Sequence, residues 1–343
     1  MICRTNPRSS KSLNGTATMA AERAGREAKN KTGRAGKRTI SIIGAGRMGT
    51  ALARALASRG YRIEAVIARR KSHARACAEL INTQPLILTS AQLDQLPPSD
   101  ILFITTPDDA IENVASQLAA MMKSRVVKMK GVKGRRKRTA LHASGALSSD
   151  ILRSLRGAGF STGSMHPLIS VSDPVHGAES LRSAFFCIEG ESAAQSVARS
   201  LVDALGAESF SINTKDKALY HAAAVMASGH MTALFDIATE MLTHCGLTAR
   251  RARAVLLPLL RSTLENLYTA DPAHALTGTF ARADTSTVRR HLEAISSSEM
   301  HDALATYTLL GLRSLQLAKR AGASSDALKE IALILEEANA SGN

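Results

Sequence analysis

The chain alternates short apolar runs with amphipathic segments, and this order predicts strands and helices in turn along its first half. The apolar runs, typical of strands buried on both faces of a parallel sheet, lie at residues 39–43, 62–68, 86–88, 101–105 and 139–143. Helical spacing is found at residues 48–58 and 71–81 and after Pro107. The alternation predicts an α/β fold with a doubly wound Rossmann sheet.

The pattern changes along the second half of the chain. Strands at residues 185–188 and 209–212, with a helix over 193–205 between them, are expected to extend the sheet. No strand pattern follows residue 213, and helices are predicted at residues 217–244, 249–268, 286–296, 301–320 and 326–339. We therefore expect a basic, disordered extension over residues 1–38, a Rossmann domain over 39–212 and an all-α C-terminal domain over 213–343.

Composition and charge disfavour several classes of protein. Apolar residues make up 45% and charged residues 21% of the chain, as in globular proteins, and no apolar run reaches the roughly 18 to 20 residues of a membrane span. The net charge of +15 is concentrated, because residues 1–38 carry +8 and residues 123–138 carry +9, which leaves −2 for the rest. Nucleic-acid binding is disfavoured, since the basic segments are a tail and an insert rather than a folded face.

The cysteines and the N-terminus bear on the compartment. Cys3, Cys77, Cys187 and Cys245 lie far apart, without the spacing of a metal site or a disulfide framework. This usage is typical of a reducing compartment, and we expect a cytoplasmic protein without a metal site. The Arg-rich, acid-poor N-terminus leaves a transit peptide open, beside a disordered extension or a start at Met19.

A glycine motif joins the first predicted strand to the first predicted helix. The motif, of the pattern GxGxxG, consists of Gly44, Ala45, Gly46, Arg47, Met48 and Gly49. In this position Gly44 permits a tight turn, Gly46 lets the backbone approach a diphosphate, and Gly49 lets helix and strand pack closely. The free N–H groups at the helix start then face the phosphates. The motif predicts a nicotinamide dinucleotide site, and the alternative is a glycine turn without a ligand.

The end of the second predicted strand indicates which dinucleotide is bound. An NAD site places a carboxylate roughly 20 residues beyond the glycines, where it binds the ribose hydroxyls. Here Glu64 comes too early, and the strand is followed by Arg69, Arg70 and Ser72. These side chains suit a 2′-phosphate, so that NADP (NADPH) is favoured over NAD. The alternative is that both arginines are solvated surface residues.

Polar residues follow two further predicted strands at the carboxyl edge of the sheet, where ligands of such folds bind. The residues expected to border the nicotinamide ribose are Thr105, Thr106 and Pro107. Ser144 and Gly145 offer a hydroxyl and an amide to a substrate carboxylate or carbonyl, and His166 lies in a polar turn predicted over residues 163–167. The alternatives are a plain strand-to-helix connection, a capping serine and a packed structural histidine.

The first helix of the predicted all-α domain carries a polar stripe. Lys217 and His221 are four residues apart and Tyr220 is three from the lysine, so that all three share one face, which Ser228 continues. Because small apolar residues follow, we expect the stripe to face a packed environment. A lysine there can donate a proton to a carbonyl or imine as hydride arrives. The alternative is a solvated lysine beside a structural histidine.

Four segments together resemble one family. The segments are residues 142–149, 163–168, 217–225 and 275–284. From about residue 39 to residue 320 the chain resembles the Rossmann-like oxidoreductases that carry a C-terminal domain of unknown function (domain of unknown function 2520). These are similar to the 6-phosphogluconate and β-hydroxyacid dehydrogenases, ketopantoate reductases and pyrroline-5-carboxylate reductases.

The resemblance carries expectations for this chain. It implies an extended Rossmann sheet, a helical domain that dimerises, Lys217 with His221 as a catalytic pair, and a substrate-binding turn at Ser144. The chain departs from the family's pattern at Gly229, where the family has Asn, and at Thr279, where it has Pro.

These observations give one leading hypothesis and two alternatives. The leading one is an NADP-dependent oxidoreductase that acts on a small carbonyl, imine or hydroxy acid and forms a homodimer through its helical domain. In it, Lys217 and His221 are catalytic, and the substrate-binding residues are Ser144, Gly145, His166 and Ser228. The alternatives are a dinucleotide-binding sensor or scaffold without turnover, and a nucleic-acid-associated protein that uses the two basic segments.

Overall fold

The computed structural model describes residues 37–81, 83–128, 137–298 and 300–341. By its internal contacts the chain divides into two compact units, one ending at Ala223 and the other beginning at Ala224. The basic extension predicted over residues 1–38 lies almost wholly outside the described residues, as does half of the basic insert at 123–138. Within the described ranges, no helix combines the length and the apolar character needed to span a membrane.

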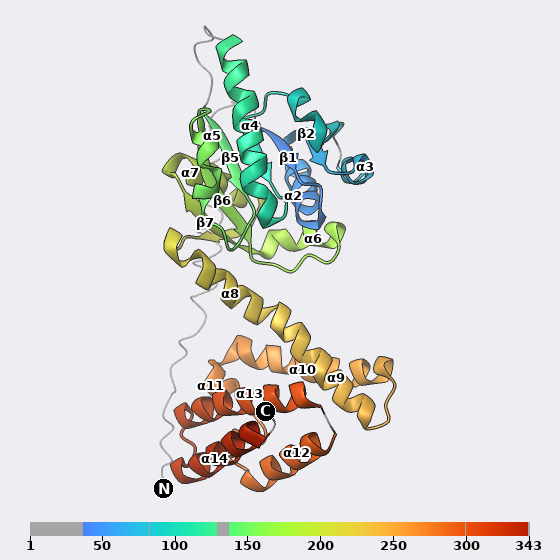
Figure 1. Ribbon diagram of the computed structural model, residues 1–343, viewed down its shortest axis with the longest axis vertical. Helices are drawn as coiled ribbons and strands as arrows, with labels where there is room; N and C mark the ends of the chain where they lie inside the picture. The colour runs from blue at the N-terminus through green and yellow to red at the C-terminus, as the bar shows by residue number, and fades with distance from the viewer. Residues whose placement is uncertain (1–36, 82, 129–136, 299, 342–343) are drawn as a thin grey trace, which may run out of the picture. The chain divides into compact units, whose positions relative to one another are not determined.

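An eight-stranded sheet forms the centre of the first unit (Figure 1). In sheet order the strands are β3 (Leu86–Thr89), β2 (Arg62–Ala68), β1 (Thr39–Ile43), β4 (Ile101–Ile104), β5 (Arg138–His142), β6 (Phe160–Pro167), β7 (Phe185–Gly190) and β8 (Glu208–Phe210). Neighbouring strands are parallel except β6 and β7. The predicted fold class, a Rossmann sheet with extension strands followed by helices, is confirmed.

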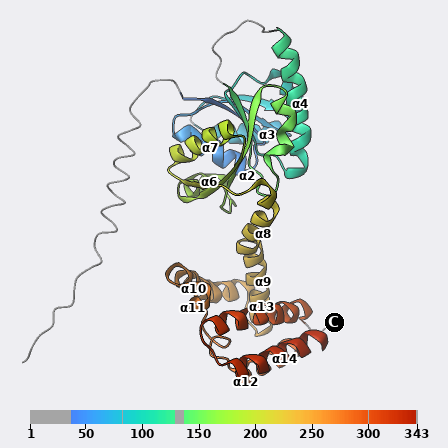
Figure 2. The same ribbon diagram turned by 90° about the vertical axis from the view of Figure 1, so that its left-hand side faces the viewer.

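Helices cover both faces of this sheet. On one face, α2 (Arg47–Ser58), α6 (Pro174–Ser180) and α7 (Ser192–Leu205) contribute to a single apolar core. On the other face, α4 (Asp108–Lys128) and α5 (Arg153–Arg156) contribute to a second core. Figure 2 shows the two layers on either side of the strands. Because the central strands are covered on both faces, β4 is a continuous apolar run, and β1 is apolar from Ile40 to Ile43 except for the buried Ser41.

One expectation for this unit is wrong. The polar turn predicted over residues 163–167 is instead the second half of strand β6. The strand lies between β5 and β7, and Ser161, Thr162 and Ser164 are buried there. Small polar side chains interrupt the hydrophobic alternation, which hides the strand in the sequence. Gly163 makes close helix packing possible, since a Cβ on it would lie only 3.0 Å from the methyl group of Ala194 on α7.

The second unit is helical. Its helices are the end of α8 (Lys217–Ala227), α9 (Gly229–His244), α10 (Ala249–Thr269), α11 (Pro272–Ala275), α12 (Thr285–Ser297), α13 (His301–Arg320) and α14 (Ser325–Ser341). The last three enclose an apolar core that includes Val288, Ile331 and Leu335. The single helix predicted over residues 217–244 is wrong in one respect, because a break at Ser228 separates α8 from α9. A glycine, which is a poor helix former, follows at position 229.

Candidate functional site

The strand order creates a switch point at the carboxyl ends of β1 and β4. From β1 the chain continues to one side of the sheet through β2 and β3, whereas β4 begins the run to the other side. Crevices at such points are the usual ligand sites of open α/β sheets. The strand ends are held close together, since Gly44 N donates to Ile67 O and Thr105 N donates to Ile43 O, both at 2.8 Å.

The glycine loop lies in this crevice, and two of its glycines cannot be replaced without a clash. Gly44 has a φ of +115°, and a Cβ on it would lie 2.6 Å from the carbonyl carbon of Thr105. A Cβ on Gly49 would collide with the Gly44 carbonyl oxygen. Gly46 differs, because no atom lies within 4 Å of a Cβ built there. The loop is therefore packed tightly on its inner side and open at Gly46.

The start of α2 offers unsatisfied N–H groups beside that open space. Gly46 is the N-cap of α2, no side chain caps the helix, and its first turn holds no acidic residue. Arg47 is exposed, whereas Ala45 and Met48 pack toward the core. Uncapped N–H groups at a helix start attract phosphate oxygens. In the adjoining loop, the buried Thr106 Oγ1 has no hydrogen-bond partner within the described structure, and with the open helix start it fits a ligand that carries phosphates and hydroxyls.

The predicted 2′-phosphate residues lie together at the carboxyl end of β2. Arg69 follows the strand, Arg70 is the N-cap of α3 (Lys71–Glu79), and Ser72 belongs to the first turn of that helix. All three are exposed, and the first turn of α3 holds no acidic residue. Within the described ranges, neither arginine forms an ion pair. Both guanidinium groups are thus available to a ligand.

Ser144 is the centre of a hydrogen-bond network at the end of β5. Its Oγ donates to Asp108 Oδ2 at 2.8 Å and accepts from the N–H groups of Ala146 at 3.2 Å and Leu147 at 3.0 Å. Its own N–H donates to His142 Nδ1 at 3.2 Å. The hydroxyl thus caps its own turn and ties that turn to the start of α4. Sequence reasoning expected this hydroxyl to bind substrate, and that role stays a prediction.

Lys217, the first residue of α8, is buried beneath this turn. Only 2% of the residue is exposed, and its Nζ donates to Ser144 O at 3.1 Å and to Ser164 Oγ at 2.9 Å. Burial lowers the pKa of Lys217, and the nearby Cys187 and Glu189 oppose that shift. The packed environment expected for the stripe is present at Lys217, whereas Ser228 at the other end of the stripe is exposed. The relay of a proton by Lys217 stays a prediction.

Sequence reasoning missed Glu189, a buried carboxylate on β7. Its oxygens accept from Ser149 N at 2.9 Å, from Ser149 Oγ at 2.7 Å and from Thr214 Oγ1 at 3.1 Å. Thr214 begins the short 3₁₀ turn Thr214–Asp216 that precedes α8. Glu189 therefore helps to fix the point at which α8, and with it Lys217, begins. The available signal was a lone acidic residue that ends an apolar strand.

His166 and His221 meet over Gly145. Their ring centroids are 5.7 Å apart, and a Cβ on Gly145 would lie 2.9 Å from His166 Nε2 and still closer to His221 Nδ1. His166 Nδ1 is 2.7 Å from the hydroxyl of Tyr220. Burial and the charge of Lys217 lower the pKa of His166 to about 4, so that its ring is neutral at neutral pH. The buried Nδ1 of His221 has no hydrogen-bond partner in the part of the chain that the structure describes.

Ser228 is the predicted substrate residue that does not belong to the first unit. It is exposed, it occupies the N-cap position of α9 without a side-chain capping bond, and its Oγ donates to Ala224 O at 2.8 Å. Its role in substrate binding stays a prediction.

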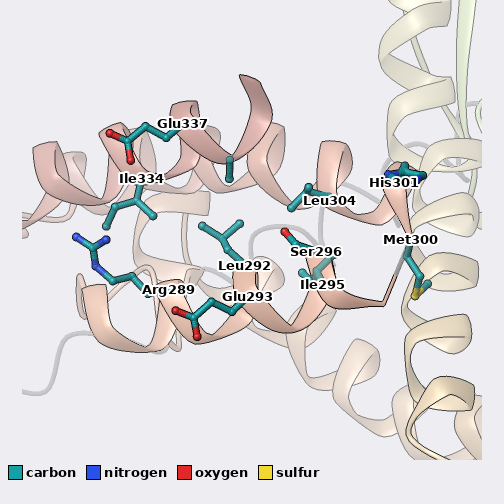
Figure 3. Close-up of a pocket in the computed structure, with 11 residues that line it drawn as sticks. Arg289, Leu292, Glu293, Ile295, Ser296, Met300, His301, Leu304, Ile334 and Glu337 are labelled. Carbon is teal, nitrogen blue, oxygen red and sulfur yellow. The ribbon is translucent and has the colours of Figure 1, made fainter. Parts of the chain in front are cut away.

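The second unit contains a separate cavity of about 560 Å³ (Figure 3). Side chains from α12, α13 and α14 line it, among them Leu292, Ile295, Leu304, Ile334 and the charged Arg289 and Glu337. None of the lining residues belongs to the motifs found in the sequence. All of its lining residues belong to the second unit.

Two family models match the chain. Residues 39–128 match the family described as NADP oxidoreductase coenzyme F420-dependent, and residues 184–314 match the domain of unknown function DUF2520. The chain carries both domains. The first match includes the glycine loop with Arg69 and Arg70, and the second includes Lys217 and His221. The family resemblance inferred from the four sequence segments is confirmed.

Several solved structures share the fold at low sequence identity. A candidate NADP oxidoreductase from Bacteroides fragilis is 20% identical, with a TM-score of 0.63 over 82% of this chain and 98% of that one. A Thermotoga maritima protein is 20% identical, with a TM-score of 0.56 over 88% and 98%. The pyrroline carboxylate reductase of Plasmodium falciparum, solved with NADP bound, is 13% identical, with a TM-score of 0.51 over 90% and 99%. A comparison with curated proteins gave no match.

Proposed function

We propose that this chain is a cytoplasmic NADP-dependent oxidoreductase that transfers hydride to or from a small carbonyl, imine or hydroxy acid substrate. The observation that carries the proposal is the glycine loop, which is closely packed at Gly44 and Gly49, open at Gly46 and followed by an uncapped helix start. The match to an NADP oxidoreductase family and the NADP bound in the P. falciparum enzyme of similar fold support it.

The residues that would hold the cofactor come from three segments. Residues 44–49 would hold the diphosphate, Arg69, Arg70 and Ser72 the 2′-phosphate, and Thr105, Thr106 and Pro107 the nicotinamide ribose. A bound nicotinamide supplies or accepts the hydride. The free guanidinium groups and the lack of a carboxylate at the end of β2 favour NADP over NAD.

On the substrate side, the proposal assigns different work to the lysine and the histidines. Lys217 holds the turn in place, because its ammonium binds the Ser144 carbonyl and has little contact with solvent. A carbonyl that accepts hydride also needs a proton, and a partly exposed imidazole is a suitable donor. His221, with an unpaired nitrogen beside Gly145, and His166, which is neutral, are the groups we propose to face the substrate.

We also propose that the helical unit forms a homodimer. Helix α10 has 21 residues, all of them described, and only Ala252 is buried. Its exposed large apolar side chains are Val255, Leu257, Leu259, Leu264, Leu267 and Tyr268. Exposed large apolar side chains that gather on one element are typical of an interface. Light scattering coupled to size-exclusion chromatography should give the molar mass of a dimer for the wild type and that of a monomer for Leu259→Glu. A monomeric wild-type protein would contradict the proposal.

The activity is tested by NADPH consumption with a panel of small ketones, keto acids and imines. We expect at least one to be reduced, with a large loss of kcat in His221→Gln. His291→Gln, which changes a histidine of the helical unit, is the matched control and should keep full activity. Tight NADPH binding without consumption of any substrate would favour the sensor hypothesis and contradict the proposed reaction.

A further inference from the structure

Tyr220 connects a buried thiol to the candidate substrate turn. Its hydroxyl is 2.7 Å from His166 Nδ1, and the Cys187 side chain nearby interacts with it electrostatically. Cys187 is fully buried on β7, directly opposite His166 in the β6–β7 pairing. The hydroxyl and the imidazole therefore connect the neighbourhood of the buried Cys187 to Gly145.

All three groups are neutral at neutral pH. Burial raises the pKa of the Cys187 thiol and of the Tyr220 phenol, so both keep their protons. Burial, followed by the charges of Lys217 and His221, lowers the pKa of His166 to about 4. The imidazole thus carries a single N–H proton, on either Nδ1 or Nε2.

The partners of Tyr220 decide which nitrogen carries that proton. A hydroxyl has one proton to donate, and the Tyr220 hydroxyl has an imidazole nitrogen at 2.7 Å and a thiol in its vicinity. An imidazole nitrogen is a good acceptor, whereas a thiol sulfur is a weak one. The stronger arrangement is therefore the Tyr220 O–H donating to His166 Nδ1.

From this geometry we infer that Tyr220 is a positioning residue that fixes His166 as the Nε2–H tautomer. The Nε2 edge of the ring lies against Gly145. The proposed function places the substrate at this turn, and the inference rests on that proposal. His166 then presents a hydrogen-bond donor rather than an acceptor. The substrate class that fits has a carbonyl or carboxylate oxygen at this position.

A purely structural role for Tyr220 predicts something different. Its ring also packs edge-on against Phe210, with centroids 5.8 Å apart, and lies 5.7 Å from the Lys217 ammonium. A phenylalanine preserves both ring contacts and removes only the hydroxyl. Tyr220→Phe therefore separates the hydrogen bond from the packing.

The experiment reads the tautomer of His166 directly, in the full chain labelled with ¹⁵N-histidine and without cofactor. Two-bond nitrogen–proton correlation spectra distinguish the two tautomers, and His166→Gln identifies the signal. We expect His166 to be mainly the Nε2–H tautomer in the wild type. In Tyr220→Phe the ratio of Nδ1–H to Nε2–H tautomer should rise roughly two- to tenfold, because one hydrogen bond is lost. Tyr307→Phe is the matched control, because the Tyr307 hydroxyl lies 2.8 Å from His291 Nδ1 and its loss should leave His166 unchanged.

Two results would overturn the inference. One is an Nδ1–H tautomer in the wild-type protein, which decides the matter even if Tyr220→Phe does not fold. The other is a Tyr220→Phe spectrum in which His166 keeps the wild-type tautomer. Cys187→Ala adds a check on direction, because a tautomer that changes in this variant would mean that Tyr220 donates to sulfur. A separate NADPH titration tests the proposed function, and its failure would leave the tautomer result standing.

Discussion

Replacing both arginines at the end of β2 should remove the preference for NADPH while the fold stays intact. Arg69 and Arg70 are exposed and form no ion pair with the rest of the described chain. The double variant Arg69→Ala/Arg70→Ala therefore removes no contact on which the sheet depends. Surface substitutions of this kind change the free energy of unfolding by about 0.5 kcal/mol or less.

The size of the expected effect follows from the exposure of the two side chains. A hydrogen bond to a charged group contributes about 1.5–3 kcal/mol. Because the guanidinium groups are solvated, the lower end of that range applies to each, which is about a tenfold change in affinity. We expect the Kd for NADPH to rise about 10- to 100-fold in the double variant, while the Kd for NADH, which has no 2′-phosphate, stays the same.

The assay is a calorimetric titration of wild type and variant with NADPH and with NADH at one salt concentration. Arg182→Ala is the control, since Arg182 is an exposed arginine of the same unit and its loss lowers the net charge without touching β2. An equal loss of affinity for both nucleotides, or none for NADPH, would refute the assignment of the 2′-phosphate site.

Two further variants test the substrate turn and the pH dependence of stability. Gly145→Ala should destabilise the turn and cost about 1–3 kcal/mol of unfolding free energy, because its Cβ would press on His166 and His221; a urea unfolding curve like that of wild type would contradict this. Burial lowers the pKa of His142 from 6.5 to about 3, so below pH 6.5 the unfolded chain binds a proton that the folded chain does not. The free energy of unfolding should therefore fall between pH 6.5 and pH 3 by up to about 1.4 kcal/mol per pH unit for this residue. Urea titrations at several pH values should show a shallower fall in His142→Gln than in the wild type, and equal slopes would contradict the prediction.

The parts of the fold that the sequence predicted are those with a local physical signal. Burial on two faces restricts β1 and β4 to mainly apolar residues, and a close backbone approach restricts the loop to glycines at 44 and 49. Both constraints are therefore visible in the sequence itself. Strand β6 escaped prediction because its buried positions hold small polar residues whose partners come from elsewhere in the chain.

The candidate site was predictable only in part, for the same reason. The i, i+3 and i, i+4 spacing placed Lys217, Tyr220 and His221 on one helical face, but nothing local showed that the lysine would be buried under Ser144. The hydrogen bonds of Glu189 and the approach of Cys187 to Tyr220 depend on the antiparallel pairing of β6 with β7. Such long-range pairings leave no periodic trace in one sequence.

The central claim is that residues 44–49 hold the diphosphate of a dinucleotide. Gly46 has an ordinary φ of −82° and no atom within 4 Å of an added Cβ, so the side chain of Gly46→Val enters the open space beside the helix start without a clash at its Cβ. An NADPH titration of wild type and variant, each with a urea unfolding curve, tests the claim most directly. The account predicts binding by the wild type and no measurable binding by a variant whose stability lies within about 1 kcal/mol of it. Equal affinities, or a wild type that does not bind NADPH at millimolar concentration, would contradict it.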